Sequence, residues 1–402
     1  MAGRLIVSLL TMSPAPAIHA AQWAIDSGIS LFGGYDDNVR LRRHNTESSA
    51  RARISPSTTF SVATPRSGSS GTVRIDVDRY ESDSNLNTEM FYVTNNSFYN
   101  MERSRAALGL RFVKDTTLNS QLEDTGVVLQ RKNRKSYIAS PTWRYNLNQR
   151  TSLDLGYSFT FVDYSASEET GLVDYQSNNF QVSLGRILNQ RSTGSVTVGF
   201  TTTGNDVNTD STYAYFQGGG SYEFSETLNA SAFAGVRRTE TKFKERIFVG
   251  FDPNDNPLFE PVGETISNSD WGGTFSASLN KKFLRGDTGL TASRNISNST
   301  SGILINVTRV TLKNTYRFSE RLSSGLTLQY YHSKSSNAAA TNLNRDYYTV
   351  NPSLTWRFTR AWRLSASYRY RVQTYDEGGG NATQNVAYLT LHYQWPRIAV
   401  SR

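Results

Sequence analysis

The residues of this chain that are best suited to chemistry are arginines that recur at every second position of short runs. From Arg363 to Val372 every odd position is Arg or Ser, and every even position is apolar or aromatic. From Asn351 to Arg357 the odd positions are again polar or basic. A guanidinium is a planar fork that binds a carboxylate or phosphate through two parallel hydrogen bonds. These residues therefore predict recognition of anions.

The spacing of the arginines identifies the elements that must position them. Strict alternation places all polar side chains on one face of a β-strand and all apolar ones on the other. The alternation predicts an all-β fold, a transmembrane, antiparallel up-and-down β-barrel of about eighteen strands, with about sixteen as the smaller alternative. The segments 89–99 and 287–297 carry the weakest pattern. The expected strands are approximately 22–34, 48–62, 71–83, 89–99, 103–115, 132–146, 151–164, 175–188, 192–204, 210–224, 228–241, 268–283, 287–297, 302–318, 322–334, 345–358, 362–375 and 383–395.

Composition excludes the main alternatives to a barrel. The chain has 402 residues, 37% of them hydrophobic, with 22 Tyr and 20 Phe. Outside the first residues it has no apolar run of the roughly 20 residues that a membrane helix needs, which excludes a helix bundle. So many aromatic residues argue against a disordered chain. The absence of cysteine excludes disulfides and thiolate metal sites.

The connectors between the expected strands alternate between short polar turns and longer stretches rich in Asn, Asp, Ser and Gly. This asymmetry is typical of transmembrane barrels, with short periplasmic turns and long extracellular loops, and it predicts that the apolar faces point outward to lipid. Aromatic residues precede the short turns, as at Trp143, Phe283 and Trp356, and predict a girdle at the periplasmic headgroup level. Pro56, Pro141 and Pro352 fall inside strands, where we expect local bulges.

The N-terminus predicts export from the cytoplasm. Arg4 is followed by an apolar segment, and the stretch from Pro14 to Ala21 ends in small residues, which is the pattern of a secretory signal peptide. The alternative is a disordered tail. We expect a signal peptide at 1–21 and a single barrel domain at 22–402, located in the bacterial outer membrane.

The basic residues on the expected inner faces form the candidate site. They outnumber the acidic residues Asp76, Asp78, Asp154 and Glu223 on the same faces. Rings of Arg and Lys bias a pore toward anions, and the formal net charge of the chain is +9. Alternatively, these residues pair with carboxylates or with lipopolysaccharide phosphates near the rim. The predicted pore-lining set is Arg51, Arg53, Arg74, Arg103, Arg105, Arg111, Arg144, Arg237, Arg309, Lys313, Arg317, Arg357, Arg363, Arg369 and Arg371.

Several segments resemble a family of β-barrel porins that accompany exosortase and exopolysaccharide export gene clusters. The resemblance extends over most of the mature chain in layout and is sharpest between residues 35 and 164. It implies a barrel in the outer membrane and, by association, polysaccharide export; its motifs contain no catalytic signature. The matching segments are Tyr35-Asp36-Asp37-Asn38-Val39, Arg53-Ile54-Ser55-Pro56, Asp115-Thr116-Thr117-Leu118, Leu122-Glu123-Asp124-Thr125-Gly126 and Pro141 to Arg150 continuing into 151–164.

Other motifs are better explained as turns. Arg285-Gly286-Asp287 matches an adhesion tripeptide, and Asp124-Thr125-Gly126 a protease fragment without its second copy. The segment 252–256 is rich in oxygen ligands but lacks the bidentate Glu of a calcium loop. His44 and His332 are expected in loops and His392 in the lumen, so no histidine is placed beside a nucleophile. We therefore expect no enzyme, no metal and no cofactor.

The leading functional hypothesis is an outer-membrane channel that exports an anionic exopolysaccharide or similar polymer through a basic lumen. The expected partners are outer-membrane lipid and lipopolysaccharide, anionic polysaccharide or small anions, and periplasmic export components, without nucleic acid. One alternative is a general or anion-selective diffusion porin. Another is a structural or adhesive barrel whose lumen is plugged by the loop 244–265. The last strand ends at Trp395, as in barrel assembly signals, although seven residues follow it.

Overall fold

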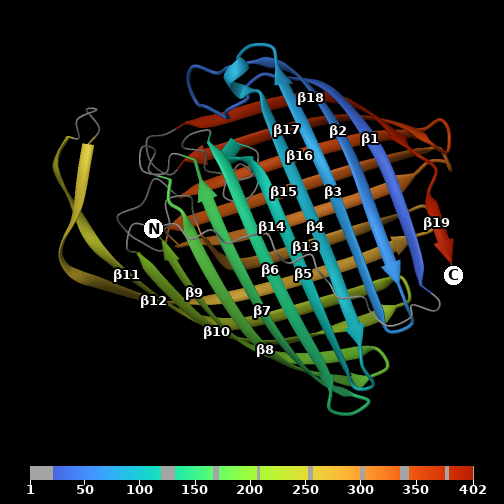
Figure 1. Cartoon of the computed structure of the whole chain (residues 1–402), viewed down its shortest axis with the longest axis horizontal. Coiled ribbons are helices and arrows are strands. Elements are labelled where there is room, and N and C mark those ends of the chain that lie inside the picture. Colours follow the sequence, from blue (N-terminus) through green and yellow to red (C-terminus); the bar gives the residue numbers. More distant parts are fainter. Residues whose placement is uncertain are drawn as a thin grey trace.

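A computed structural model describes residues 21–118, 132–165, 172–205, 209–251, 257–298, 304–335, 344–375 and 380–401, with only the backbone of 243–251, 257–266, 298, 335, 375 and 401. These residues form one antiparallel sheet that closes into a barrel (Figure 1). Within them, no helix is long and apolar enough to cross a membrane. The strands are β1 (Gln22–Asp36), β2 (Ser49–Ala63), β3 (Ser67–Tyr80), β4 (Thr88–Asn100), β5 (Ser104–Thr116), β6 (Asn133–Asn146), β7 (Thr151–Tyr164), β8 (Tyr175–Asn189), β9 (Ser192–Asn205), β10 (Asp210–Ser225), β11 (Leu228–Phe251), β12 (Pro257–Phe283), β13 (Gly286–Asn298), β14 (Leu304–Arg317), β15 (Leu322–Ser335), β16 (Arg345–Arg357), β17 (Trp362–Tyr375), β18 (Asn381–Gln394) and β19 (Ile398–Ser401).

The barrel closes between its first and eighteenth strands. Each strand pairs with its neighbours in sequence, and β1 pairs on one side with β2 and on the other with β18, from Gly28↔Gln394 to Asp36↔Val386. The prediction of an eighteen-strand barrel is confirmed. The two strands with the weakest sequence pattern, β4 and β13, are both formed.

The residues after Trp395 continue the closing strand. The backbone N–H of Trp395 donates to the carbonyl of Ser27 at 3.0 Å, and β19 pairs with β1 from Ile25↔Ile398 to Gln22↔Ser401. Between β18 and β19 the register shifts by one residue, as in a β-bulge. The residues beyond the terminal aromatic thus lengthen the seam that closes the barrel.

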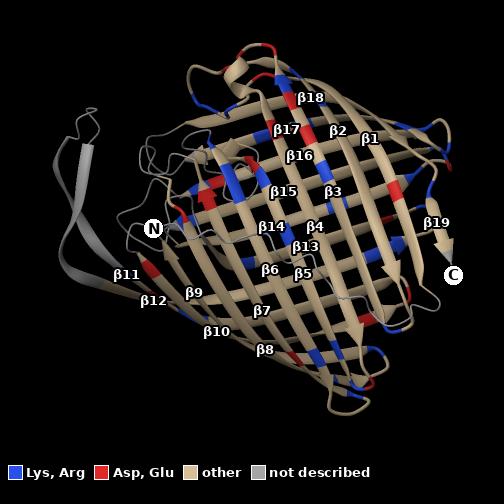
Figure 2. Ribbon diagram, viewed as in Figure 1, with Lys and Arg blue, Asp and Glu red and all other residues tan. Residues whose placement is uncertain are grey.

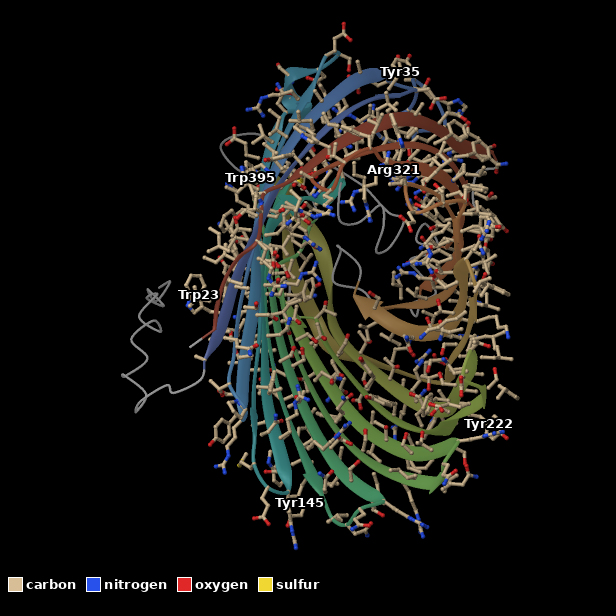
Figure 3. The ribbon with its side chains drawn as sticks, turned by 90° about the vertical axis from the view of Figure 1, so that its right-hand side faces the viewer. Trp23, Tyr35, Tyr145, Tyr222, Arg321 and Trp395 are labelled. Atoms are coloured by element: carbon tan, nitrogen blue, oxygen red, sulfur yellow. The ribbon has the colours of Figure 1, made fainter. Side chains whose placement is uncertain are left out.

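Most of the large exposed apolar side chains lie on a single face of their strand. On β9 these are Val196, Val198 and Phe200, exposed by 43%, 54% and 49%. Seen along the barrel axis, Trp23 and Tyr145 point away from the ring of strands (Figure 3). The apolar faces therefore form the outer surface of the closed barrel, and the alternate residues face the interior.

The two ends of the barrel differ in their connections. We define the short-turn end by the connectors 64–66, 101–103, 147–150, 190–191, 226–227, 284–285, 318–321 and 358–361. The long-loop end carries the connectors 37–48, 81–87, 117–132, 165–174 and the remaining links between strands. β1 begins and β18 ends at the short-turn end (Figure 1). By the rule for such barrels, the short-turn end is periplasmic.

Two expectations about strand bounds were wrong. The described parts of the predicted loop 244–265, residues 244–251 and 257–265, instead continue β11 and β12, which pair as far as Phe251↔Pro257 and extend beyond the other strands (Figure 1). β3 begins at Ser67 rather than at residue 71, because Thr64 makes a tight turn. Its hydroxyl accepts the backbone N–H of Ser67 at 2.9 Å, while the Thr64 N–H donates to the Ser67 carbonyl at 2.7 Å.

The prediction of bulges at the three strand prolines was also wrong. At Pro56, Pro141 and Pro352 the ladder loses two pairs on one side, but the register is the same before and after the gap. On its other side each proline is paired, for example Ile29↔Pro56. A proline lacks only the N–H donor, so a single ladder can open locally while both flanks hold the register.

The long-loop end of the lumen is partly filled by the connector 37–48. Leu41 of this loop is buried against Tyr331 of β15, Tyr347 of β16 and Ala382 of β18. Because Tyr331 and Tyr347 lie on the interior faces of their strands, the loop folds inward. The Asn38 amide fixes its conformation by donating to the carbonyls of Arg42 and Thr383, both at 2.8 Å.

Candidate anion-binding lumen

The most buried charged group of the interior is Asp78 on β3, which is fully buried. Arg51 of β2 donates to it from Nε at 3.2 Å. Arg53 donates from Nε at 2.6 Å and from Nη2 at 2.8 Å. Because side chains alternate along a strand, Arg51 and Arg53 lie on the same face of β2. The register pairs Arg53 with Asp78, so the carboxylate lies on that same face of the sheet, beside both arginines. Asp78 is therefore held by two forked contacts.

A second carboxylate lies two residues earlier on β3. Asp76 is 2% exposed, its Oδ2 lies 3.5 Å from Nη1 of Arg53, and its Oδ1 lies 3.2 Å from Nε of Arg74. We call Arg51, Arg53, Arg74, Asp76 and Asp78 the ion-pair cluster. It contains three arginines and two carboxylates, so one positive charge remains.

Aromatic rings cover the arginines of the ion-pair cluster. The guanidinium of Arg51 lies 5.1 Å from the ring centre of Tyr80 and 5.6 Å from that of Phe32. The guanidinium of Arg74 lies 4.2 Å from the ring centre of Tyr92. Cation–π contacts of this kind hold a planar guanidinium in place without neutralising its charge. The cluster is thus a fixed source of positive potential.

The opposite part of the interior carries cations and no acidic residue. We define the basic wall as the interior faces of β14 to β18. Over the described residues of these five strands, the registers place Arg and Lys on the interior face, and neither Asp nor Glu. The cations of the basic wall are Arg309, Lys313, Arg317, Arg345, Arg357, Arg363, Arg369 and Arg371.

Several cations of the basic wall contact polar or aromatic side chains. Arg369 lies 5.8 Å from the ring centre of Tyr388, and Arg371 donates to the Gln384 Oε1 at 3.2 Å. Gln384 in turn donates to the Asp36 carboxylate at 2.8 Å. This chain of contacts joins the basic wall to the loop 37–48, whose first turn begins at Asp36.

The basic wall and the ion-pair cluster meet around a cavity of about 360 Å³. This cavity lies beside the inward loop, since Val39 is part of its lining. Its volume is at the lower end of the roughly 300–1,000 Å³ typical of ligand sites. The charged and aromatic groups that line it are Arg51, Arg53, Arg74, Arg369, Arg371, Asp36, Phe32, Tyr80, Tyr92 and Tyr388.

Arginines also gather at the short-turn end. A cavity of about 680 Å³ is lined by Arg285, Arg317, Arg321 and Arg357, with Glu320 as the one acidic residue of its lining. Arg321 lies at this end of the ring in the view along the barrel (Figure 3). Charged residues occur along the strands as well as at the turns (Figure 2). Across the described chain, no carboxylate lies within 4.0 Å of these four guanidinium groups.

A larger cavity lies at the same end beneath β5 to β9. Its volume is about 1280 Å³, and its lining includes Arg103, Arg105 and Arg144. Arg144 is paired with Asp154, and Arg105 stacks on the ring of Phe98 at 4.3 Å. Arg103 lies in the turn 101–103 rather than in a strand, so its backbone does not fix it to one face.

Thirteen of the fifteen predicted pore-lining residues separate into two groups; of the other two, Arg309 lies 5.4 Å from the ring centre of Tyr331 and Arg371 donates to Gln384. Five are paired with carboxylates, as the alternative interpretation expected: Arg51, Arg53, Arg74, Arg144 and Arg237. Arg237 is 2% exposed and also contacts Thr239 and Asn306. Among the described residues, no carboxylate lies within 4.0 Å of a second group: Arg103, Arg105, Arg111, Lys313, Arg317, Arg357, Arg363 and Arg369. That these side chains line a conducting pathway stays a prediction.

Sequence reasoning missed the residues that hold the inward loop. Asp37 accepts the backbone N–H and the side-chain amide of Asn385, both at 2.7 Å, and Asp36 accepts Gln384. The segment Tyr35 to Val39 thus fastens β1 to β18. Consecutive Asp and Asn residues were visible in the sequence, but their partners lie about 350 positions away.

In the described structure one histidine, His392, lies beside a serine hydroxyl, but no described carboxylate lies within 4.0 Å of its ring to complete a Ser–His–acid triad. The expectation that His332 lies in a loop was wrong. It belongs to β15, on the outer face, and its Nδ1 lies 3.0 Å from the Asp346 carboxylate, which also accepts the Tyr330 hydroxyl at 2.7 Å. His392 is on the interior face, 2.9 Å from the Ser30 hydroxyl. Within the described ranges no cluster of His, Asp or Glu could hold a metal ion.

In the tripeptide at 285–287, Arg285 lies in the turn 284–285, and Gly286 and Asp287 are the first residues of β13, where they pair with β14. The segments 124–126 and 252–256 lie outside the described residues, as does the predicted signal peptide up to residue 20.

Comparisons with known proteins give structural matches only. No family model and no curated protein sequence matches the chain. The fold is similar to OccAB4 of Acinetobacter baumannii, with 10% identity, a TM-score of 0.46, and coverage of 94% of this chain and 99% of that one. It is similar to OccK2 (OpdF) of Pseudomonas aeruginosa, with 10% identity, a TM-score of 0.45, and coverage of 93% and 97%. The ferric-catecholate import receptor Fiu of E. coli K12 matches with 9% identity, a TM-score of 0.45, and coverage of 92% and 82%.

The architecture itself gives the location. A closed antiparallel barrel with an apolar outer surface satisfies every backbone hydrogen bond within lipid and leaves no open sheet edge. Aromatic side chains lie next to the short turns, as expected for an interfacial girdle. There the ring centre of Tyr393 lies 4.6 Å from that of Trp362 and 5.1 Å from that of Trp395. The chain is a transmembrane β-barrel of the bacterial outer membrane.

Proposed function

We propose that this barrel is an outer-membrane channel for anions, and that its cargo is an anionic exopolysaccharide leaving the cell. The observation that carries the proposal is the basic wall. Cations lining one side of a lumen bias it toward anions, and low-dielectric walls strengthen their field. On the other side, two of the cluster's three positive charges are balanced by Asp76 and Asp78.

The basic wall extends along the lumen. Arg363 of β17 lies near the short-turn end and Arg369 lies six residues further along, a separation of roughly 20 Å along the strand. Arg371 then reaches the cavity beside the inward loop. An anion that enters at the Arg317 and Arg357 cluster thus meets a further cation at each stage of the passage.

The choice of a polysaccharide rests on aromatic rings placed among the cations. Tyr388 lies between Arg369 and Phe32, whose ring centre is 5.0 Å away. An apolar ring face with a polar edge suits a sugar ring, while the neighbouring guanidinium suits its carboxylate. Sugars that carry acid groups would use both. The resemblance to porins of exopolysaccharide export clusters agrees with this cargo.

Electrical recording of the purified barrel in planar bilayers tests the channel. We expect conductance with a reversal potential, in a KCl gradient, that favours chloride. Replacing Arg317, Arg357 and Arg363 by Gln should reduce that preference, whereas Lys281→Gln on the outer surface should leave it unchanged. Absence of conductance would contradict the channel, and cation preference would contradict the role of the basic wall.

Secretion measurements test the cargo separately. Deleting the gene should abolish surface polysaccharide while intracellular synthesis continues. If secretion is unchanged but the purified barrel conducts anions, the protein is instead an anion-selective diffusion porin.

The inward loop supports a second candidate, a barrel that is closed at rest. Leu41 is 2% exposed within the lumen, and its contacts with β15 and β16 cross the interior. Shortening the loop 37–48 should then raise conductance strongly. Equal conductance with and without the loop would show that the native lumen is already open.

A further inference from the structure

Two lysines face each other on the outer surface near the long-loop end. Lys114 of β5 and Lys135 of β6 are direct cross-strand partners. They lie on the same face as Phe112 and Tyr137, which point to lipid. Like charges directly opposite each other in a sheet are destabilising. A nearby anion would offset this repulsion between Lys114 and Lys135.

Protein carboxylates compensate this charge only in part. Asp163 lies 3.2 Å from the Lys135 ammonium, and Glu89 lies 3.0 Å from Arg79 on the neighbouring strands. Among the described residues no carboxylate lies within 4.0 Å of Lys114. These residues of the outer surface thus comprise three cations and two carboxylates, all near the ends of β3 to β7.

A row of aromatic rings places these charges relative to the membrane. Phe91, Phe112, Tyr137 and Phe161 belong to β4, β5, β6 and β7, and their successive ring centres are 6.0, 5.0 and 6.1 Å apart. Each ring lies two residues from a charged residue on the long-loop side: Glu89, Lys114, Lys135 and Asp163. Aromatic girdles mark the boundary between hydrocarbon and headgroups, so the charges lie at headgroup level.

We propose that Lys114, Lys135 and Arg79 bind a phosphate group of lipopolysaccharide in the outer leaflet, with its acyl chains against the aromatic row. The position selects the ligand, because the charges lie at the depth of the lipid phosphates and at the end of the barrel that carries the long loops. Lys114 is the main donor, since Asp163 already engages Lys135. The site is on the lipid face and does not depend on the proposed channel function.

Binding of lipid A to the purified full-length barrel in detergent, followed by native mass spectrometry, tests the proposal. The probes are bisphosphorylated lipid A and its dephosphorylated form. The variant is Lys114→Gln with Lys135→Gln, and the control is Lys281→Gln, an outer-face lysine at the short-turn end whose Nζ contacts Thr227 at 3.1 Å. Losing a charge-assisted contact should weaken binding of the bisphosphorylated lipid by about tenfold or more.

Folding of each variant is checked by heat-modifiable electrophoretic mobility, and Lys114→Gln alone replaces the double variant if the latter does not fold. Equal binding of both lipid forms to the wild-type barrel would overturn the proposal. So would an equal loss in the Lys281 control. Displacement of the lipid by millimolar inorganic phosphate would show that the site takes free phosphate instead.

Discussion

Replacing Asp78 by Asn removes the charge that holds the ion-pair cluster together. Asn keeps the size of the side chain but removes the carboxylate partner of Arg51 and leaves Arg53 with only its 3.5 Å contact to Asp76, in a site where Asp78 itself is 0% exposed. The forked contacts of Arg51 and Arg53 with this side chain, at 2.5 to 3.2 Å, become neutral or are lost. Breaking a buried ion pair on one side costs about 3–5 kcal/mol. The side chains of Arg51 and Arg53 are 19% and 25% exposed, so solvent partly compensates for the lost carboxylate. We therefore expect the free energy of unfolding to fall by about 3 kcal/mol, at the lower limit of this range.

The matched control is Asp154→Asn. Its partner Arg144 is 62% exposed, and Asp154 itself is 30% exposed, so solvent screens the pair. Exposed pairs contribute about 1 kcal/mol or less. The two variants make the same chemical change on the same interior surface and differ in burial.

Urea unfolding of the barrel in lipid vesicles, followed by tryptophan fluorescence, measures both losses. A difference of about 2 kcal/mol between the variants corresponds to roughly thirtyfold in the unfolding equilibrium. If Asp78→Asn is no more destabilising than Asp154→Asn, burial does not determine the strength of the cluster, and the reasoning fails.

Three further predictions concern other parts of the barrel. Arg317→Gln with Arg357→Gln should lower anion preference without changing stability by more than about 0.5 kcal/mol, because neither guanidinium has a described carboxylate within 4.0 Å. Reversal potential and urea unfolding check this, and unchanged selectivity would contradict it. Removing residues 396–402 deletes β19, so the seam loses the pairs to Gln22 through Ile25. Assembly should then be slower, and gels should show a larger fraction of unfolded barrel. Assembly at the native rate would refute a role for the tail. Pro352→Ala should change stability by no more than about 1 kcal/mol and leave the register intact; cysteine cross-linking between β16 and β17 would reveal any shift.

The sequence by itself determined the strand pattern and the assignment of faces. Alternation is a local property with a period of two, so runs such as Arg363 to Val372 reveal their two faces without knowledge of their neighbours. Connector lengths then oriented the apolar faces outward. The eighteen strands followed within a few residues, except where the hydroxyl of Thr64 moved the start of β3 and where β11 and β12 continue beyond the barrel.

The tertiary structure decided which charges meet. Arg51 and Arg369 are equivalent in the sequence, since both occupy polar positions of amphipathic strands. The register of β2 against β3 gives Arg51 the carboxylate of Asp78, while the interior faces beside Arg369 carry no acid. The sheet's closure also places Asp37 beside Asn385 and folds the loop 37–48 into the lumen. The contact of Asp37 with Asn385 depends on pairing between strands at opposite ends of the chain, and the contact of Arg51 with Asp78 depends on the register between two strands. The alternation within one strand contains no information about either.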